Sequence, residues 1–413
     1  MAATIQDLLQ PQVILDVISR IKKGRGPLAS WLGFQPTSFD PHTVSVSGPN
    51  TLKGTGSVRN VTYRIFDETR VPIKGRAPGT GPATVAANPM GQNQVAVARF
   101  HEKIPLNYEF LGNLSPMVGP NSQVDAGGQA YISQQTTFLA QQANNMVEML
   151  AAGMMRDSLY LQMQGDNWLP VFSDPTTQSP AAFGFRINFQ IPAGNKSQLN
   201  MLGAGDIITV PWDNVGAPII GNLQSIIAAY AQLSRYAMTD IWINSLMWVN
   251  IITNTEVRNT AGSANTPFAE FERSDEKGMS DSGPSNKYSA ILRGQPTVKW
   301  HFCDDTVALY TDVDPSYATV PTGAVPSTAL LVKLVPDNMA IFSTVPSADW
   351  TRLYLGGEYV VENPGQPGAL RQGWYFWHEY VTQPSVIELI ALLNAIPLLY
   401  VPKVLAPATV TGF

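Results

Sequence analysis

The chain has 413 residues, enough for two or three domains around a large buried core. Charged residues make up only 14% of it, against roughly 25% in ordinary globular proteins. The formal net charge of −5 leaves no electrostatic footprint for nucleic-acid recognition. With so few charges, the 9 Trp, 14 Tyr and 16 Phe favour a surface that packs against other subunits.

The cysteine content and the apolar stretches argue against a disulfide-rich, secreted or membrane-spanning protein. The single cysteine, Cys303, rules out an internal disulfide framework and a cysteine-rich metal site, and we expect it to be a small buried residue beside Phe302. The N-terminus lacks the basic and apolar regions of a signal peptide. The most apolar stretch, 386–405, contains Glu388 and Lys403, so we expect no membrane span and synthesis in the cytosol.

The first 60 residues predict an amphipathic helix followed by an extended arm. Apolar residues recur at helical spacing over 12–23, and the basic run 20–25 suits the negative end of that helix better than a nucleic acid. The segment after it is interrupted by Gly and Pro and has no period. Because such an arm cannot fold by itself, we expect it to lie over the surface of a partner.

Two runs rich in Val, Ile, Tyr and Phe, 60–73 and 94–110, predict the strands of a long hairpin. Much of the stretch 73–106 consists of Gly, Pro, Ala, Thr and Asn, which build no core. A two-stranded hairpin is marginal in water by itself. We therefore expect this hairpin either to lie against a neighbouring molecule or to be mobile.

A long helix is predicted over 129–164, where no proline occurs. Its apolar positions recur at spacings of three and four, and its length would be roughly 50 Å at 1.5 Å per residue. Its Met and Gln content suits a surface that adapts to slightly different packings. A core helix of a monomer is the open alternative.

The rest of the chain predicts a mixture of helices and strands without βαβ repetition. We expect a second hairpin from 184–192 and 206–212, a helix over 222–238, and a loop or peripheral helix over the polar stretch 254–287. Several strands separated by Pro- and Thr-rich loops follow. This pattern predicts an α+β fold.

Catalytic motifs are nearly absent. The Gly-x-Gly turns at Gly54 and Gly203 lack the third glycine of a dinucleotide-binding loop, and no phosphate-binding loop occurs. No sequence motif couples a histidine to a nucleophile or to a second metal ligand, so structural roles are favoured. We predict no enzyme activity, no cofactor and no metal. The residues weighed for such roles are His42, His101, His301, His378, Asp304, Asp305, Asp312 and Asp314.

The order of the parts is more specific than any motif. A helix and arm, a long hairpin with a Gly- and Pro-rich tip, a long helix, a mixed region and closing strands follow one another. Within them stand "NKYSAILRGQPTVKWHFCDDTVALY", "LVPDNMAIFSTVPSADWTRLYLGG" and "QPSVIELIALLNAIPLLYVPKVLAPATV". The chain thereby resembles the major capsid proteins of tailed bacteriophages with the Hong Kong 97-type fold, and most closely the lambda-type capsid protein E family.

The resemblance implies five regions. These are an N-terminal helix and arm (1–60), an E-loop (61–106), a P-domain with its spine helix (107–215), an A-domain (216–355) and a return to the P-domain (356–413). It implies contacts between subunits through the E-loop and a spine helix built on apolar positions. The E-loop residues are Lys74, Arg76, Pro78, Pro82 and Met90, and the spine-helix residues are Ile132, Leu139, Met146 and Leu150.

The function implied is that of a shell subunit. Hexamers and pentamers of the chain would form an icosahedral capsid that encloses double-stranded DNA without sequence-specific binding. It would be part of the virion, assembled in the host bacterial cytoplasm with a separate scaffold and a portal; a decoration protein is left open. Lys74 has no identifiable asparagine partner, so no cross-link is predicted. The alternatives are an encapsulin-like nanocompartment shell and, less favoured, a β-rich enzyme.

Overall fold

The structure is a computed structural model. It describes residues 26–34, 38–40, 45–54, 59–66, 90–107, 126–164, 167–172, 184–260, 269–273, 288–292, 295–310, 329–360, 368–382 and 385–412. Within these ranges no helix is long and apolar enough to span a membrane. Helices and mainly antiparallel strands are mixed without βαβ repetition, which confirms the predicted α+β class.

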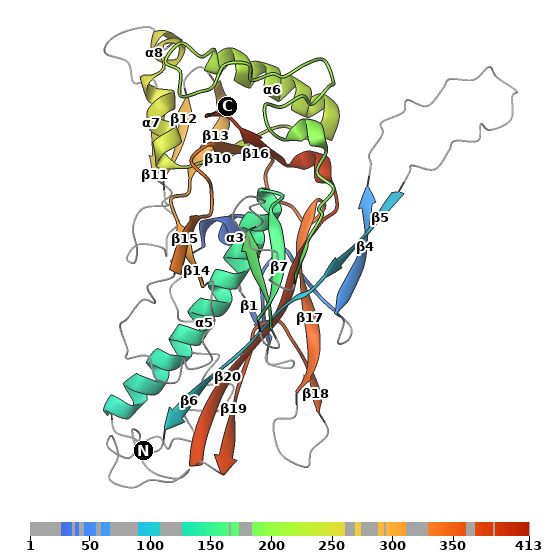
Figure 1. Cartoon of the computed structure of the whole chain (residues 1–413), viewed down its shortest axis with the longest axis vertical. Coiled ribbons are helices and arrows are strands. Elements are labelled where there is room, and N and C mark those ends of the chain that lie inside the picture. Colours follow the sequence, from blue (N-terminus) through green and yellow to red (C-terminus); the bar gives the residue numbers. More distant parts are fainter. Residues whose placement is uncertain are drawn as a thin grey trace, which may run out of the picture.

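The lower part of the molecule is a nine-stranded sheet with one long helix beside it (Figure 1). Strand β20 is central: one edge pairs with β6, and the other pairs with β19 and then β17. The main path runs β18-β17-β20-β6-β8-β7-β9, and β3 is added beside β17. The strands are β3 (Thr51–Lys53), β6 (Ala98–Asn107), β7 (Leu159–Gln164), β8 (Asn167–Phe172), β9 (Gly184–Arg186), β17 (Thr351–Val360), β18 (Ala369–Gln372), β19 (Tyr375–Thr382) and β20 (Ser385–Leu399).

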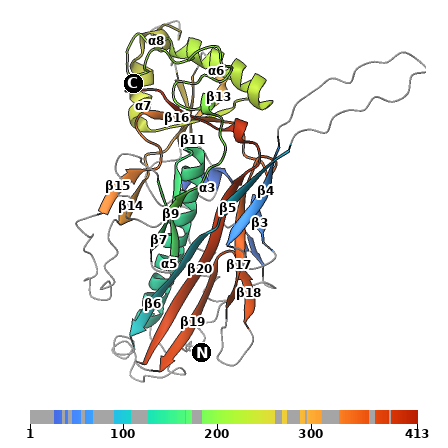
Figure 2. The same cartoon turned by 45° about the vertical axis from the view of Figure 1, so that its right-hand side comes forward.

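The upper part is a six-stranded sheet with helices around it (Figures 1 and 2). Its order is β11-β12-β13-β10-β16-β21, and only β10 and β13 are parallel. The strands are β10 (Asp240–Ile243), β11 (Ala269–Arg273), β12 (Tyr288–Leu292), β13 (Gln295–Phe302), β16 (Met339–Ser343) and β21 (Ala406–Thr409). The helices are α6 (Ile219–Ser234), α7 (Ser245–Thr253) and α8 (Thr255–Thr260).

Three small two-stranded sheets complete the strands. They are β1 (Ser38–Asp40) with β2 (Ser45–Ser47), β4 (Asn60–Phe66) with β5 (Met90–Ala96), and β14 (Thr306–Tyr310) with β15 (Ala329–Lys333). The short 3₁₀ helices are η1 (Ala193–Asn195) and η3 (Pro402–Val404). The β4–β5 pair confirms a hairpin that begins at Asn60, but its second strand is 90–96 and not 94–110. Residues 98–107 form β6, which pairs with β20 because Phe100 and Leu106 bury in the core of the large sheet.

The long helix, α5 (Ala126–Met155), ends earlier than the predicted 129–164. Asp157 takes a left-handed conformation with φ 51°, and the N–H of Ser158 donates to the carbonyl of Gly153 at 2.9 Å, which closes the helix. From Leu159 onward the chain is strand β7, with Leu159 and Leu161 buried. The absence of proline did not extend the helix, because a left-handed residue ends it equally well.

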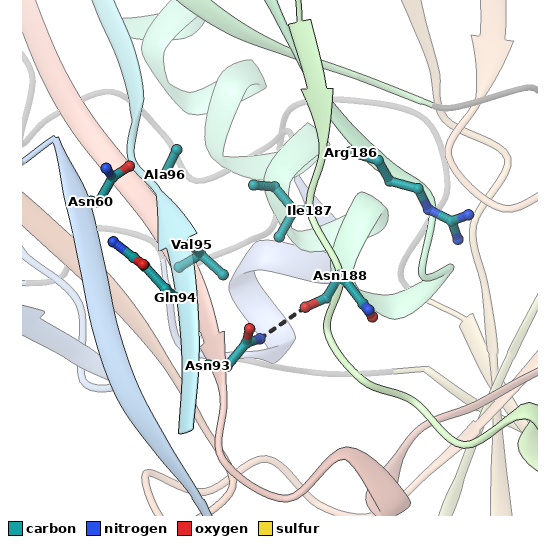
Figure 3. A pocket seen from close by; sticks show the side chains of 8 residues that line it. All are labelled: Asn60, Asn93, Gln94, Val95, Ala96, Arg186, Ile187 and Asn188. Carbon is teal, nitrogen blue, oxygen red and sulfur yellow. Dashed lines mark hydrogen bonds between the residues drawn. The ribbon is translucent and has the colours of Figure 1, made fainter. Parts of the chain in front are cut away.

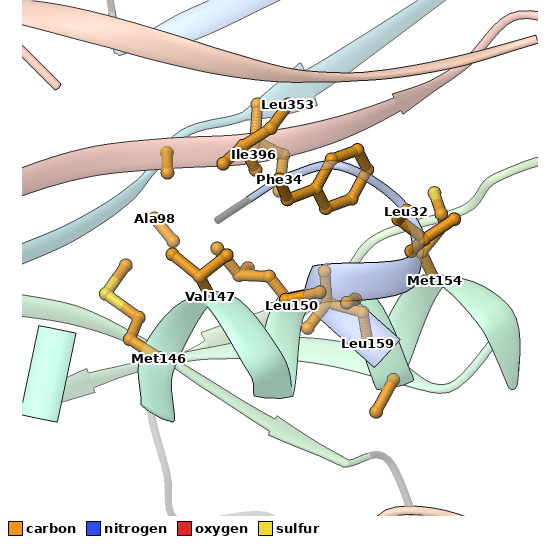
Figure 4. Packing of buried hydrophobic residues seen from close by; sticks show 14 of the residues in the cluster. Leu32, Phe34, Ala98, Met146, Val147, Leu150, Met154, Leu159, Leu353 and Ile396 are labelled. Atoms are coloured by element: carbon orange, nitrogen blue, oxygen red, sulfur yellow. The ribbon is translucent and has the colours of Figure 1, made fainter. Parts of the chain in front are cut away.

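Part of the predicted arm folds within its own chain, which corrects the expectation that it lies over a partner. Residues 27–31 form the short helix α3 (Pro27–Trp31), which packs on α5 (Figure 4). Leu32 and Phe34 are fully buried in the same core as Leu150 of α5. The reason is apolar burial that the irregular sequence pattern did not reveal. The helix predicted over 12–23 lies outside the described residues.

The second predicted hairpin is wrong. β9 pairs with β7, and 206–212 forms no strand. Instead the N–H of Trp212 donates to the carbonyl of Val410 at 2.7 Å, and its ring packs edge-on against Phe342. Tertiary burial of Trp212 therefore decides the path of this loop. The polar stretch 254–287 contains α8 and strand β11, and not only loop and helix.

The two sheets do not follow the expected region boundaries: most of β6, expected in the E-loop (61–106), pairs with β20 in the nine-stranded sheet, and two further departures concern the upper core. Trp212, expected in the first domain (107–215), belongs to the core of the six-stranded sheet. Strand β21, expected in the return segment 356–413, pairs with β16 in that same sheet. Both departures follow from apolar side chains that bury in the upper core. The remaining boundaries stay predictions.

Candidate assembly interface

The β4–β5 hairpin leaves the body of the molecule beside β17 (Figures 1 and 2). Its register runs from Asn60 opposite Ala96 to Phe66 opposite Met90. Alternate residues of β4 face opposite ways, so Tyr63 is buried while Phe66 is 43% exposed. An exposed aromatic ring on a two-stranded ribbon is a feature that a partner surface would cover.

The far end of the described hairpin, at Phe66, is attached to Tyr400, which directly follows β20. The N–H of Phe66 donates to the carbonyl of Tyr400 at 2.9 Å, and the Tyr63 ring packs edge-on against the Tyr400 ring with centroids 5.8 Å apart. Burial raises the pKa of the Tyr63 hydroxyl. The hydroxyl accepts a hydrogen bond from Asn93 Nδ2 at 3.0 Å. These contacts hold the described ribbon on the body as far as Phe66.

A cleft of about 420 Å³ separates β5 from the residues that follow β9 (Figure 3). Its lining is neutral apart from one guanidinium, and it includes no carboxylate, histidine or thiol. No group of three potential metal ligands occurs in the described ranges. The cleft therefore offers hydrogen bonds and no catalytic chemistry. The lining residues are Asn60, Asn93, Gln94, Val95, Ala96, Arg186, Ile187 and Asn188.

The predicted spine-helix residues are all buried in the chain's own core. Exposed fractions are 3% for Ile132, 1% for Leu139, 4% for Met146 and 0% for Leu150. These four side chains therefore belong to the core of the chain and do not form an exposed, adaptable surface. The outward positions of α5 include Phe138, which is 49% exposed.

Of the five predicted E-loop residues, the structure describes only Met90. Lys74, Arg76, Pro78 and Pro82 lie outside the described residues. Met90 is the first residue of β5 and stands opposite Phe66. Their contact with a neighbouring subunit stays a prediction.

The residues weighed for catalysis lie in structural contacts where the structure describes them. His301 Nε2 lies 2.6 Å from Asp240 Oδ1, and its ring stacks on Trp242 with centroids 4.7 Å apart. Cys303 is buried as predicted, and burial raises the pKa of its thiol well above the usual range. Asp304 accepts the N–H of Ser245 at 2.8 Å at the start of α7. His42, Asp312 and Asp314 lie outside the described residues.

Two residues with unusual contacts were missed by sequence reasoning. Asn93 joins the hairpin to the segment after β9, and Glu148 holds α3 on α5. The sequence does mark Glu148, because it is the only charged residue in a helix of 30 residues. Asn93 had a weaker one, a polar residue at the inward position of a strand that otherwise buries Val95.

Comparison with solved structures gives matches over most of the chain. A prophage capsid protein of E. coli CFT073 is 10% identical, with 100% of both chains covered and a TM-score of 0.46. A phage-related protein of Bordetella bronchiseptica RB50 is 8% identical over 96% of this chain and 95% of that one, with a TM-score of 0.47. A chain of the SrpI encapsulin complex of Synechococcus elongatus PCC 7942 is 8% identical over 87% and 84%, with a TM-score of 0.38. No protein-family model and no curated protein matches the chain.

Proposed function

We propose that the chain is the major capsid protein of a tailed bacteriophage, with the Hong Kong 97-type fold. Hexamers and pentamers of it form an icosahedral shell around packaged double-stranded DNA. The observation that carries the proposal is the β4–β5 hairpin, a separate two-stranded sheet that leaves the body and exposes Phe66. One face of the ribbon packs in the chain's own core through Tyr63 and Val95, and another subunit would cover the exposed Phe66.

The order of the folded elements supports the same function. The hairpin precedes α5, which lies beside a sheet that closes with β20, and a second sheet is inserted between them in the chain. This is the order expected from the resemblance to the capsid fold. Closed symmetric shells require one chain to make nearly equivalent contacts in several settings, and a projecting ribbon supplies reach without disturbing either core.

We place α5 on the inner wall of the shell, where its lack of exposed charge suits contact with DNA. Glu148 is the only charged residue of the helix and is 4% exposed, so its outward side is neutral. A wall coated with Lys and Arg would bind the phosphate backbone and resist its movement during packaging. A neutral helix face lets DNA slide past.

Electron microscopy of the purified protein tests the proposal, with sedimentation velocity alongside. The chain is expressed alone and together with its neighbouring genes, which would supply a scaffold and a portal. We expect closed shells, or discrete pentamers and hexamers. A stable monomer or dimer under every condition would overturn the assembly function and would return the search to an unseen active site.

A deletion separates the role of the hairpin from that of the body. Removal of Gly79 to Gly91 is expected to abolish shells or to lower their heat resistance while leaving both cores folded. Normal shells from this variant would contradict the hairpin's role. The contents of the shells distinguish the alternative: nuclease-protected DNA supports a capsid, whereas an enclosed cargo protein supports an encapsulin-like nanocompartment.

A further inference from the structure

The β4–β5 hairpin is attached to the body on two sides. On the first side it contacts Tyr400 through the Phe66 N–H and the Tyr63 ring. On the second side Asn93 Nδ2 donates to the carbonyl of Asn188 at 2.8 Å (Figure 3), and the buried Val95 belongs to the same hydrophobic core as Ile187. Asn93 supplies the polar part of this second attachment.

Asn93 also links the two sides to each other. The same Nδ2 donates to the Tyr63 hydroxyl at 3.0 Å, so the two N–H bonds of the amide serve two acceptors. Asn93 is 9% exposed and Tyr63 is 5% exposed, so water competes little for these bonds. Loss of the amide would leave two buried acceptors without this donor.

An asparagine is not what the strand itself favours at this position. Residues of β5 alternate, with Asn93 and Val95 inward and Gln92 and Gln94 exposed. Strand interiors prefer β-branched residues over asparagine, and an inward Val would continue the pattern of Val95. A residue that departs from the local rule indicates a role outside the strand.

The cleft shows why this one bond matters. It lies between β5 and residues 186–188 at the end of β9 and just after it, so side chains do not fill this space (Figure 3). Only Val97 separates β5 from β6, the strand that enters the large sheet. On this side the hairpin is therefore held by the Asn93 hydrogen bond together with the burial of Val95.

We propose that Asn93 is a positioning residue that fixes the direction in which the β4–β5 hairpin leaves the body, and thereby the curvature at which subunits assemble. The inference rests on the proposed function, because it assigns a geometric role to the hairpin of a shell subunit. With the Asn93–Asn188 bond made, the hairpin reaches its neighbour in one direction. Without it, the cleft gives the hairpin room to swing.

Two substitutions in the same strand test the proposal. Asn93→Val removes the bond and suits the buried strand position, whereas Gln92→Val places the same side chain on the exposed face. We expect Asn93→Val shells to lose the single diameter of the wild type and Gln92→Val shells to keep it, and the thermal midpoint of the unassembled Asn93→Val chain to fall below that of Gln92→Val because two buried acceptors lose their donor. Asn93→Ala replaces Asn93→Val if the larger side chain prevents folding.

Hydrogen exchange of the unassembled chain gives a second readout that needs no shell. Amides of 60–66 and 90–96 are expected to exchange faster in Asn93→Val than in Gln92→Val. Unchanged exchange, or shells of wild-type diameter from Asn93→Val, would overturn the inference. Failure of the wild type to form any shell would instead contradict the proposed function, and the exchange comparison would still decide the role of Asn93.

Discussion

The carboxylate of Glu148 accepts the backbone N–H of Ala29 at 2.7 Å. Its second oxygen accepts the N–H of Leu28 at 2.9 Å, so the side chain satisfies the first turn of α3. No Lys, Arg or His of the described ranges forms an ion pair with it. Burial, with a smaller contribution from the charge of Asp305, raises the pKa of Glu148 to about 7 against the effect of the two backbone hydrogen bonds.

This pKa predicts that acid stabilises the folded chain, because burial of the neutral carboxyl group costs less free energy than burial of the carboxylate. The folded state holds a proton on Glu148 up to about pH 7, whereas the exposed side chain releases it near 4.5. The stabilisation is therefore complete below about pH 4.5 and is lost as the pH rises through 7. The full difference corresponds to roughly 3 kcal/mol, at about 1.4 kcal/mol for each pH unit.

Urea unfolding of the unassembled chain between pH 5 and 8 measures this dependence, together with hydrogen exchange of residues 26–34 corrected for the intrinsic rate. Glu148→Gln removes the titrating group, so we expect its pH profile to be flatter than that of the wild type over this range. Parallel profiles for the two proteins would show that Glu148 does not carry the effect.

Replacing two helical glycines by alanine should change the free energy of unfolding in opposite directions. A Cβ on Gly153 would lie 2.8 Å from Leu159 Cδ1 and 3.2 Å from Leu159 Cα, so Gly153→Ala should cost about 1–3 kcal/mol despite the higher helix propensity of Ala. Gly221 of α6 has open space, with Glu256 Oε1 at 3.8 Å as the nearest atom. Gly221→Ala should therefore stabilise by roughly 0.5–1 kcal/mol. Thermal midpoints that shift in the same direction would contradict the clash at Gly153.

Truncations on the inward and outward sides of α5 should lower the free energy of unfolding by unequal amounts. Leu150 is fully buried beside Phe34 and Met154 (Figure 4), so Leu150→Ala should lower the free energy of unfolding by about 2–5 kcal/mol. Phe138 is 49% exposed on the same helix, and Phe138→Ala should change it by no more than about 0.5 kcal/mol. Chemical denaturation of both variants provides the check. Equal losses would mean that Phe138 is covered within the chain.

Periodic segments were predictable from the sequence because their pattern is local. The paired strands of the β4–β5 hairpin and most of α5 follow from β-branched runs and from apolar spacings of three and four. The end of α5 did not follow, because the left-handed turn at Asp157 leaves no proline or glycine as a marker. Trp212 was placed in a strand for a related reason: its burial depends on Phe342, which is distant in the sequence.

The sequence by itself determined the α+β class, the hairpin whose composition builds no core, and the position of a long helix, since each depends on residues close together in the chain. Only the tertiary structure decided that α3 packs on α5, that Glu148 holds it there, and that Asn93 reaches Asn188. These contacts join residues 95 to 119 positions apart. A carboxylate or an amide shows its partner only when folding brings a donor or an acceptor within hydrogen-bond distance.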